Sequence, residues 1–108
     1  MPYKVVVTKQ AQEDIKAKKK YILNHFKYRE YANNFARQVK KAISALDTFP
    51  LGYNTTGFKY RGYDIYLKPT QAHLLFYTVD EKKKIVTVLR VMQDGMDWQY
   101  IINGRLYN

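Results

Sequence analysis

The sequence predicts an α+β fold. An N-terminal strand, an antiparallel helix hairpin and a three-stranded antiparallel meander are expected to form a mostly antiparallel four-stranded sheet with the helices on one face. Three observations support this: a short alternating apolar run opens the chain, two long stretches with helical periodicity follow, and three strand-like runs joined by turns come after them. The length of 108 residues fits a single domain, residues 1–108. The runs cover residues 3–7, 9–26, 32–46, 59–68, 73–79 and 85–92.

Both helical stretches carry an apolar stripe on one side. Thr8 is expected to cap the first helix, because its hydroxyl can accept a free backbone amide of the first turn. In this helix Lys18 interrupts a stripe made of Ala11, Ile15, Ile22 and Phe26. The second stripe has i, i+3, i+4, i+7 spacing, and Pro50 stops that helix. Its members are Ala32, Phe35, Ala36, Val39, Ile43 and Leu46.

The C-terminal runs differ in polarity. Residues 59–68 alternate aromatic and polar side chains and are expected to form one strand after a polar turn at 52–57, with Arg61 and Gly62 marking a bulge or a close backbone approach. Residues 73–79 are almost continuously apolar, as a central strand buried on both faces would be. The first strand must then pair inside this sheet through a long connection. Asp97 is expected to cap a short helix at residues 98–103 that Gly104 ends.

The composition narrows the possible classes of protein. There is no cysteine, which excludes disulfides and thiolate metal sites, and His25 and His73 lie far apart, so neither a metal nor a cofactor is expected. No run has the length of a signal peptide or a membrane span, which favours a cytoplasmic protein without a membrane partner. The net charge is +10, and residues 1–49, with 11 basic and 4 acidic residues, hold +7 of it. Polyanions or acidic proteins are therefore the expected partners, although a solvated basic surface is an alternative.

Motifs of common catalytic sites are absent: the chain has no Gly-rich phosphate loop, no paired carboxylates and no Ser/His/Asp elbow. Basic and aromatic residues remain, and a metal-free ribonuclease could use such groups as base, acid and phosphate-stabilising cation. The catalytic candidates are Arg61, His73, Arg90 and Tyr100. The candidates for binding a target or a nucleic acid are Lys16, Lys18, Lys19, Lys20, Lys59, Asp97 and Trp98.

The order of elements, together with YKVVVT, SALDTFPLG, YDIYLKP and HLLFYTVDEKKKIVTVLRVMQDGMDW, resembles the RelE/ParE superfamily of bacterial type II toxins. The resemblance covers nearly the whole chain and implies a RelE-like fold. It also implies a toxin that arrests growth and is held inactive by a cognate acidic antitoxin. The candidate contacts for the antitoxin are Tyr21, Leu23, Tyr28 and Tyr31. Ordinary packing within the fold explains these four side chains equally well.

Two branches of this superfamily imply different targets. RelE-like toxins cleave mRNA on the ribosome, whereas ParE-like toxins poison DNA gyrase without nuclease activity of their own. The RelE-like pattern places cations at positions that hold Asp64, Tyr66, Leu74 and Asp94 (or Gln93) in this chain, and only Tyr100 matches it. Each missing donor would remove about 3 kcal/mol of transition-state stabilisation, so the ParE-like branch is favoured. His73 is one place from Leu74 and is expected on the opposite face of the strand. A RelE-like nuclease and an inactive basic binding module are the alternatives.

Overall fold

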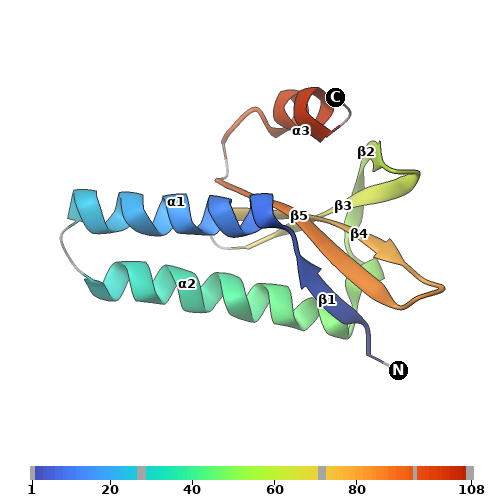
Figure 1. Cartoon of the computed structure of the whole chain (residues 1–108), viewed down its shortest axis with the longest axis horizontal. Coiled ribbons are helices and arrows are strands. Elements are labelled where there is room, and N and C mark those ends of the chain that lie inside the picture. Colours follow the sequence, from blue (N-terminus) through green and yellow to red (C-terminus); the bar gives the residue numbers. More distant parts are fainter. Residues whose placement is uncertain (1, 27–28, 71–72, 94, 107–108) are drawn as a thin grey trace.

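The computed structural model describes residues 2–26, 29–70, 73–93 and 95–106 (Figure 1). None of the helices in these ranges is long and apolar enough to cross a membrane. Two single-turn 3₁₀ helices, η1 and η2, follow the helix hairpin. The elements are β1 Lys4–Val7, α1 Lys9–Phe26, α2 Arg29–Ser44, η1 Ala45–Asp47, η2 Pro50–Gly52, β2 Asn54–Tyr60, β3 Tyr63–Pro69, β4 His73–Asp80, β5 Ile85–Gln93 and α3 Trp98–Leu106.

The sheet has five strands in the order β1-β5-β4-β3-β2, one more than predicted. β1 pairs in parallel with β5, and every other pairing is antiparallel. β1 therefore lies at an edge of the sheet rather than inside it. The additional strand arises because the predicted strand 59–68 is interrupted at Arg61 and Gly62. These residues have φ of 53° and 86° and form the turn of a tight hairpin rather than a bulge, because two positive φ values fit a two-residue hairpin turn.

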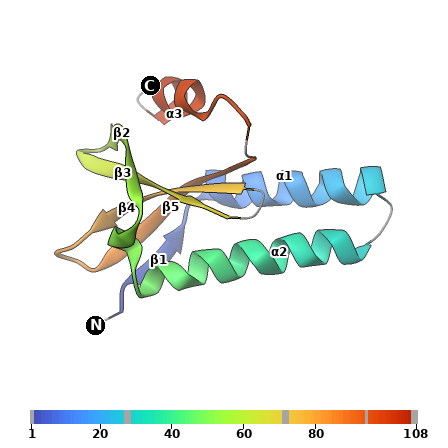
Figure 2. The same cartoon turned by 180° about the vertical axis from the view of Figure 1, so that it is seen from behind.

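The two faces of the sheet are covered by different helices. The antiparallel α1–α2 hairpin covers one face, as predicted, and α3 lies on the other (Figures 1 and 2). β4 contributes side chains to the cores on both faces of the sheet. Leu75 and Tyr77 belong to the core under the hairpin, whereas Leu74 and Phe76 belong to the core under α3. Seven of the eight β4 residues are buried, which confirms its prediction as a central strand.

The apolar stripes of the sequence form the core beneath the hairpin. The second stripe is confirmed as buried at Ala32, Phe35, Val39, Ile43 and Leu46. Burial of such side chains contributes about 1.5–3 kcal/mol for each large aliphatic or aromatic residue.

The ends of α1 and α3 are fixed by capping residues. Thr8 caps α1 as predicted, since its Oγ1 accepts from the amide of Ala11 at 3.2 Å and donates to the carbonyl of Leu89 at 3.1 Å. Asp97 likewise accepts from the amide of Tyr100 at 3.3 Å at the start of α3. α3 continues past Gly104 to Leu106, so its predicted end was wrong. One glycine costs a helix only about 1 kcal/mol relative to alanine and need not end it.

Candidate functional site

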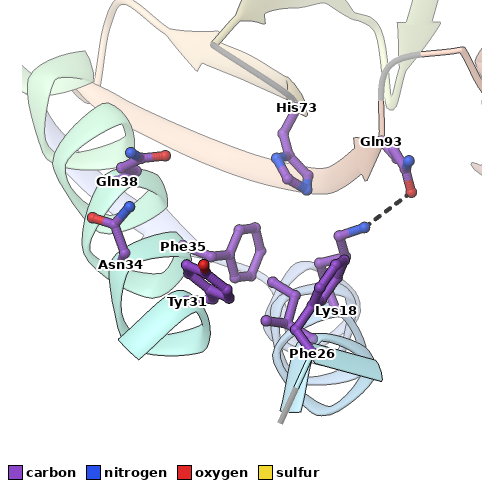
Figure 3. A pocket seen from close by; sticks show the side chains of 9 residues that line it. Lys18, Phe26, Tyr31, Asn34, Phe35, Gln38, His73 and Gln93 are labelled. Carbon is purple, nitrogen blue, oxygen red and sulfur yellow. Dashed lines mark hydrogen bonds between the residues drawn. The ribbon is translucent and has the colours of Figure 1, made fainter. Parts of the chain in front are cut away.

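A pocket opens where β4 begins and β5 ends, beside the distal half of the helix hairpin (Figure 3). Its volume is about 480 Å³. A neighbouring hollow of about 350 Å³ shares Lys18, His73 and Gln93 with it. The pocket is lined by Lys18, Ile22, Phe26, Tyr31, Asn34, Phe35, Gln38, His73 and Gln93.

The backbone of His73 is fixed at the inner wall of the pocket. Its amide donates to Thr70 Oγ1 at 3.2 Å and its carbonyl accepts from the Thr70 amide at 2.8 Å, which fixes the first residue of β4. The imidazole lies on the hairpin side of the sheet, 4.7 Å from the ring of Phe35 and opposite in direction to Leu74, as predicted. The residue is only 8% exposed, and its Nε2 is buried without a hydrogen-bond partner. Burial, and secondarily the charge of Lys18, lower the pKa of His73, which favours the neutral imidazole.

Lys18 brings a positive charge to the same pocket. Its Nζ donates to Gln93 Oε1 at 3.1 Å, as drawn in Figure 3, and lies 4.9 Å from the centre of the Tyr21 ring. Gln93 is the last residue of β5 and pairs with His73, so the sheet ends at the level of Lys18. This geometry accounts for the lysine in the apolar stripe of α1, because the side chain there meets a pocket instead of a strand.

Arg90 is engaged in a different interaction. Its Nε and Nη2 donate to the two carboxylate oxygens of Asp14 at 2.8 and 3.0 Å, and the two side chains are 10% and 11% exposed. Asp14 Oδ2 also accepts from the Val91 amide at 3.0 Å. β1 ends at Val7, opposite Val88, so Asp14 supplies an acceptor to the β5 edge just beyond the paired region. The charge of Arg90 is thus neutralised inside the fold.

The four catalytic candidates are not brought together. Arg61 lies in the β2–β3 turn, where its guanidinium is 5.0 Å from the Tyr60 ring, beside a hollow that includes Asp80 at the far end of β4. Seven residue steps of strand, about 23 Å, separate that end from His73. Tyr100 is 76% exposed on α3, which covers the other face of the sheet.

The positions compared with the RelE-like pattern are also spread over both faces. Asp64 pairs with Lys59 at 3.7 Å on the surface, and the Tyr66 ring stacks on Tyr77 at 5.4 Å under the hairpin. Leu74 is in the core under α3. Asp94 lies outside the described residues.

The other binding candidates are distributed along α1 and at the start of α3. Lys16 and Lys20 are exposed and Lys19 is half-buried, and none of the three lines the pocket. The Trp98 ring packs against Phe58 and Phe76, which is a structural contact.

Two of the predicted antitoxin contacts lie close to the pocket. Tyr31 lines it, with its ring edge-on to Phe26 at 6.1 Å, and Tyr21 lines the neighbouring hollow and stacks on His25 at 3.9 Å. Leu23 is exposed nearby on α1, and Tyr28 lies outside the described residues.

The sequence alone did not identify three polar residues that line the pocket, Asn34, Gln38 and Gln93. The interruption of the stripe at Lys18 was the sequence signal for this site.

The fold and sequence have known counterparts. A family model described as ParE toxin of type II toxin-antitoxin system, parDE, matches residues 5–98. A search of curated protein sequences finds no significant match. The chromosomal ParDE system of P. aeruginosa aligns with a TM-score of 0.66 at 13% identity, covering 84% of this chain and 95% of that one. The RelBE2 toxin-antitoxin complex of Mycobacterium tuberculosis aligns with a TM-score of 0.57 at 22% identity, covering 86% and 99% of the two chains.

The archaeal RelE-RelB complex of Pyrococcus horikoshii OT3 has the same fold as well, with a TM-score of 0.58 at 19% identity, and covers 88% of this chain and 98% of that one. At these identities the structural matches establish a RelE-like fold. The family model, which spans most of the sequence, goes further: the chain belongs to the ParE toxin family of type II toxin-antitoxin systems.

Proposed function

We propose that this protein arrests bacterial growth by binding DNA gyrase, that it does so without catalysis of its own, and that a cognate acidic antitoxin holds it inactive. Membership of the ParE toxin family supports the toxin role. The dispersal of the catalytic candidates is the observation that carries the choice of target.

Metal-free RNA cleavage needs a base, an acid and a cation around one phosphate. Lys18 is the only lysine or arginine among the described residues that line the pocket of His73. Arg90 is held by Asp14, Arg61 lies at the far end of the sheet, and Tyr100 lies on the other face. This distribution supports a toxin that acts by binding.

The test is to induce the protein without its antitoxin and to follow labelled thymidine and methionine incorporation over the first minutes. Inhibition of gyrase predicts an early fall in DNA synthesis while protein synthesis continues. The purified protein should also inhibit supercoiling by gyrase. His73→Gln should retain this inhibition, since a toxin that acts by binding needs no proton-transfer group. Unchanged supercoiling with a folded toxin would refute the proposal.

A ribosome-dependent mRNA endonuclease is the second candidate. It is favoured by one observation, the buried and unpartnered Nε2 of His73 beside the Lys18 ammonium group, which pairs a proton-transfer group with a cation. This function predicts cleaved message in a translating lysate, and the cleavage should be lost in His73→Gln. Intact message after addition of the protein would exclude it. If neither assay responds and growth continues, the protein is an inactive basic binding module.

An antitoxin partner is inferred from relatives and from charge. The RelBE2 and RelE-RelB structures are of complexes, and the net charge of +10 here favours an acidic partner. The exposed apolar side chains near the tip of the hairpin offer a surface for it, at Tyr21, Leu23, Phe26 and Tyr31. If a small acidic open reading frame adjoins the gene, co-expression with its product should restore growth and give a stable complex in size-exclusion chromatography. Continued growth arrest without complex formation would count against this partner.

A further inference from the structure

The pocket beside the hairpin contains an unsatisfied polar atom. Nε2 of His73 is the buried side-chain nitrogen or oxygen without a hydrogen-bond partner in the described part of the chain. Such an atom is rare in native folds, because its lost hydration is not replaced. Thr70 fixes the backbone of His73, and its ring lines the pocket 4.7 Å from the ring of Phe35. A partner that enters the pocket can supply the missing hydrogen bond.

The same pocket has a positive charge without a matching anion. Among the described residues that line it, Lys18 is charged and no carboxylate is present. Lys18 donates to the neutral amide oxygen of Gln93. Asp14 lines the neighbouring hollow, but both of its oxygens already accept from Arg90, and one of them accepts also from the Val91 amide. The pocket therefore has room for a negative group from outside.

An apolar wall adjoins these polar groups. Ile22 and Phe35 are buried, and the rings of Phe26 and Tyr31 form its outer part at 51% and 55% exposure. Figure 3 shows the Phe26, Tyr31 and Phe35 side chains on the helix side and His73 opposite them on the sheet. A partner that fits must bring a negative group and an apolar group side by side, as a peptide with neighbouring acidic and apolar residues does.

We propose that Lys18 and His73 form a receptor for one carboxylate side chain of a peptide segment, whose neighbouring apolar side chain packs on Ile22, Phe26 and Tyr31. The inference rests on the proposed function in one respect, that the segment belongs to the antitoxin. Lys18 supplies a charge-assisted hydrogen bond, and His73 donates a second one from Nε2 in the tautomer that carries its proton there. A phosphate group fits less well, because a single lysine with neutral amides would leave most of its charge uncompensated.

The proposal can be tested on the full chain with blocked peptides, acetyl-Leu-Phe-Glu-amide and acetyl-Leu-Phe-Gln-amide, which differ by one carboxylate. Binding is followed by NMR shifts of the His73 ring and of the Lys18 and Gln93 amides. The Glu peptide should bind about tenfold more tightly than the Gln peptide, as expected for a partly desolvated charge-assisted hydrogen bond. Inorganic phosphate at the same concentration should not displace it.

Matched variants separate the receptor from general attraction to a basic helix. Lys18→Gln and His73→Gln should each reduce the preference for the Glu peptide to less than about threefold. Lys16→Gln, with the same loss of charge on the same helix, should retain it. A backbone spectrum of each variant establishes that it is folded.

Three outcomes would overturn the proposal: equal or absent binding of the two peptides, the same preference in Lys18→Gln and His73→Gln as in the unmodified chain, or displacement by phosphate. Its failure is distinct from failure of the proposed function. Growth arrest and gyrase inhibition without peptide binding would leave the target assignment standing, whereas peptide binding without any effect on gyrase would leave the receptor standing.

Discussion

The ion pair between Asp14 and Arg90 should contribute strongly to stability. Removal of one partner of a buried pair leaves the other charge uncompensated, which costs about 3–5 kcal/mol. Asp14→Ala removes both Arg90 contacts and the acceptor for the Val91 amide, at 2.8, 3.0 and 3.0 Å. We therefore expect a loss of about 4 kcal/mol, a large part of the roughly 5–15 kcal/mol that stabilises a domain of this size.

Urea unfolding followed by circular dichroism measures this loss. With a denaturant slope near 2 kcal/mol per molar, the midpoint of Asp14→Ala should fall by about 2 M. The surface pair of Lys59 and Asp64 provides a matched control, because its atoms are 3.7 Å apart and its side chains are 66% and 54% exposed. Asp64→Ala should change the free energy of unfolding by less than about 1 kcal/mol.

A double variant tests whether the loss of stability in Asp14→Ala comes from the uncompensated charge of Arg90. Replacement of both partners by apolar residues, Asp14→Leu with Arg90→Met, should be far less destabilising than the two single changes added together, because no buried charge remains. Equal midpoint shifts for Asp14→Ala and Asp64→Ala, or strict additivity in the double variant, would refute the reasoning.

Three further predictions concern His73, Tyr77 and Arg61. The pKa of His73 is lowered in the folded state, so the unfolded chain binds more protons below about pH 6.5 and stability should decline as pH falls from there towards the lowered pKa. His73→Gln should lose this component of the pH dependence in urea melts, and an unchanged slope would contradict it. Tyr77→Phe removes a buried 2.5 Å hydrogen bond from the phenol to the Pro50 carbonyl and should cost about 1–3 kcal/mol in the same assay; a loss below experimental error would show that the carbonyl is satisfied otherwise. Arg61→Asn should stabilise the fold by part of the roughly 1–2 kcal/mol that the left-handed region costs an ordinary residue, since asparagine tolerates the φ of 53° better, whereas Arg61→Val should destabilise it.

Periodicity in the sequence was sufficient to predict the helix hairpin and the central strand. The pattern from Ala32 to Leu46 was assigned to a helix, and the run from His73 to Val79 was assigned to a central strand. Most of the helix stripe and all seven residues of the strand run are buried, as expected. The β2–β3 hairpin was missed for a physical reason. β2 is an edge strand with mostly exposed side chains, so it carries no clear apolar alternation, and its turn has arginine instead of asparagine or aspartate before the glycine.

Long-range polar contacts could not be predicted in the same way. Asp14 and Arg90 are 76 positions apart, and only the fold brings the end of β1, the first turns of α1 and the edge of β5 together. Arg90 was proposed as a catalytic candidate from its residue type, whereas the structure shows its guanidinium group paired with the carboxylate of Asp14. Lys18 was the opposite case, because it was predicted only as one of four lysines on α1, and the structure places it in the pocket with His73.

The end of the sheet accounts for both the pocket and the surface around it. Gln93 and His73 are paired at this end, and Lys18 reaches Gln93, so the two turns of α1 beyond Lys18 extend past the last paired strands, as Figure 1 shows. On these turns Tyr21 is 47% exposed and Phe26 is 51% exposed. A hairpin needed only to cover the sheet would end near Lys18. The extension is therefore best explained by a partner that covers it, and the same partner would meet the unpaired Nε2 of His73 at the base of the pocket.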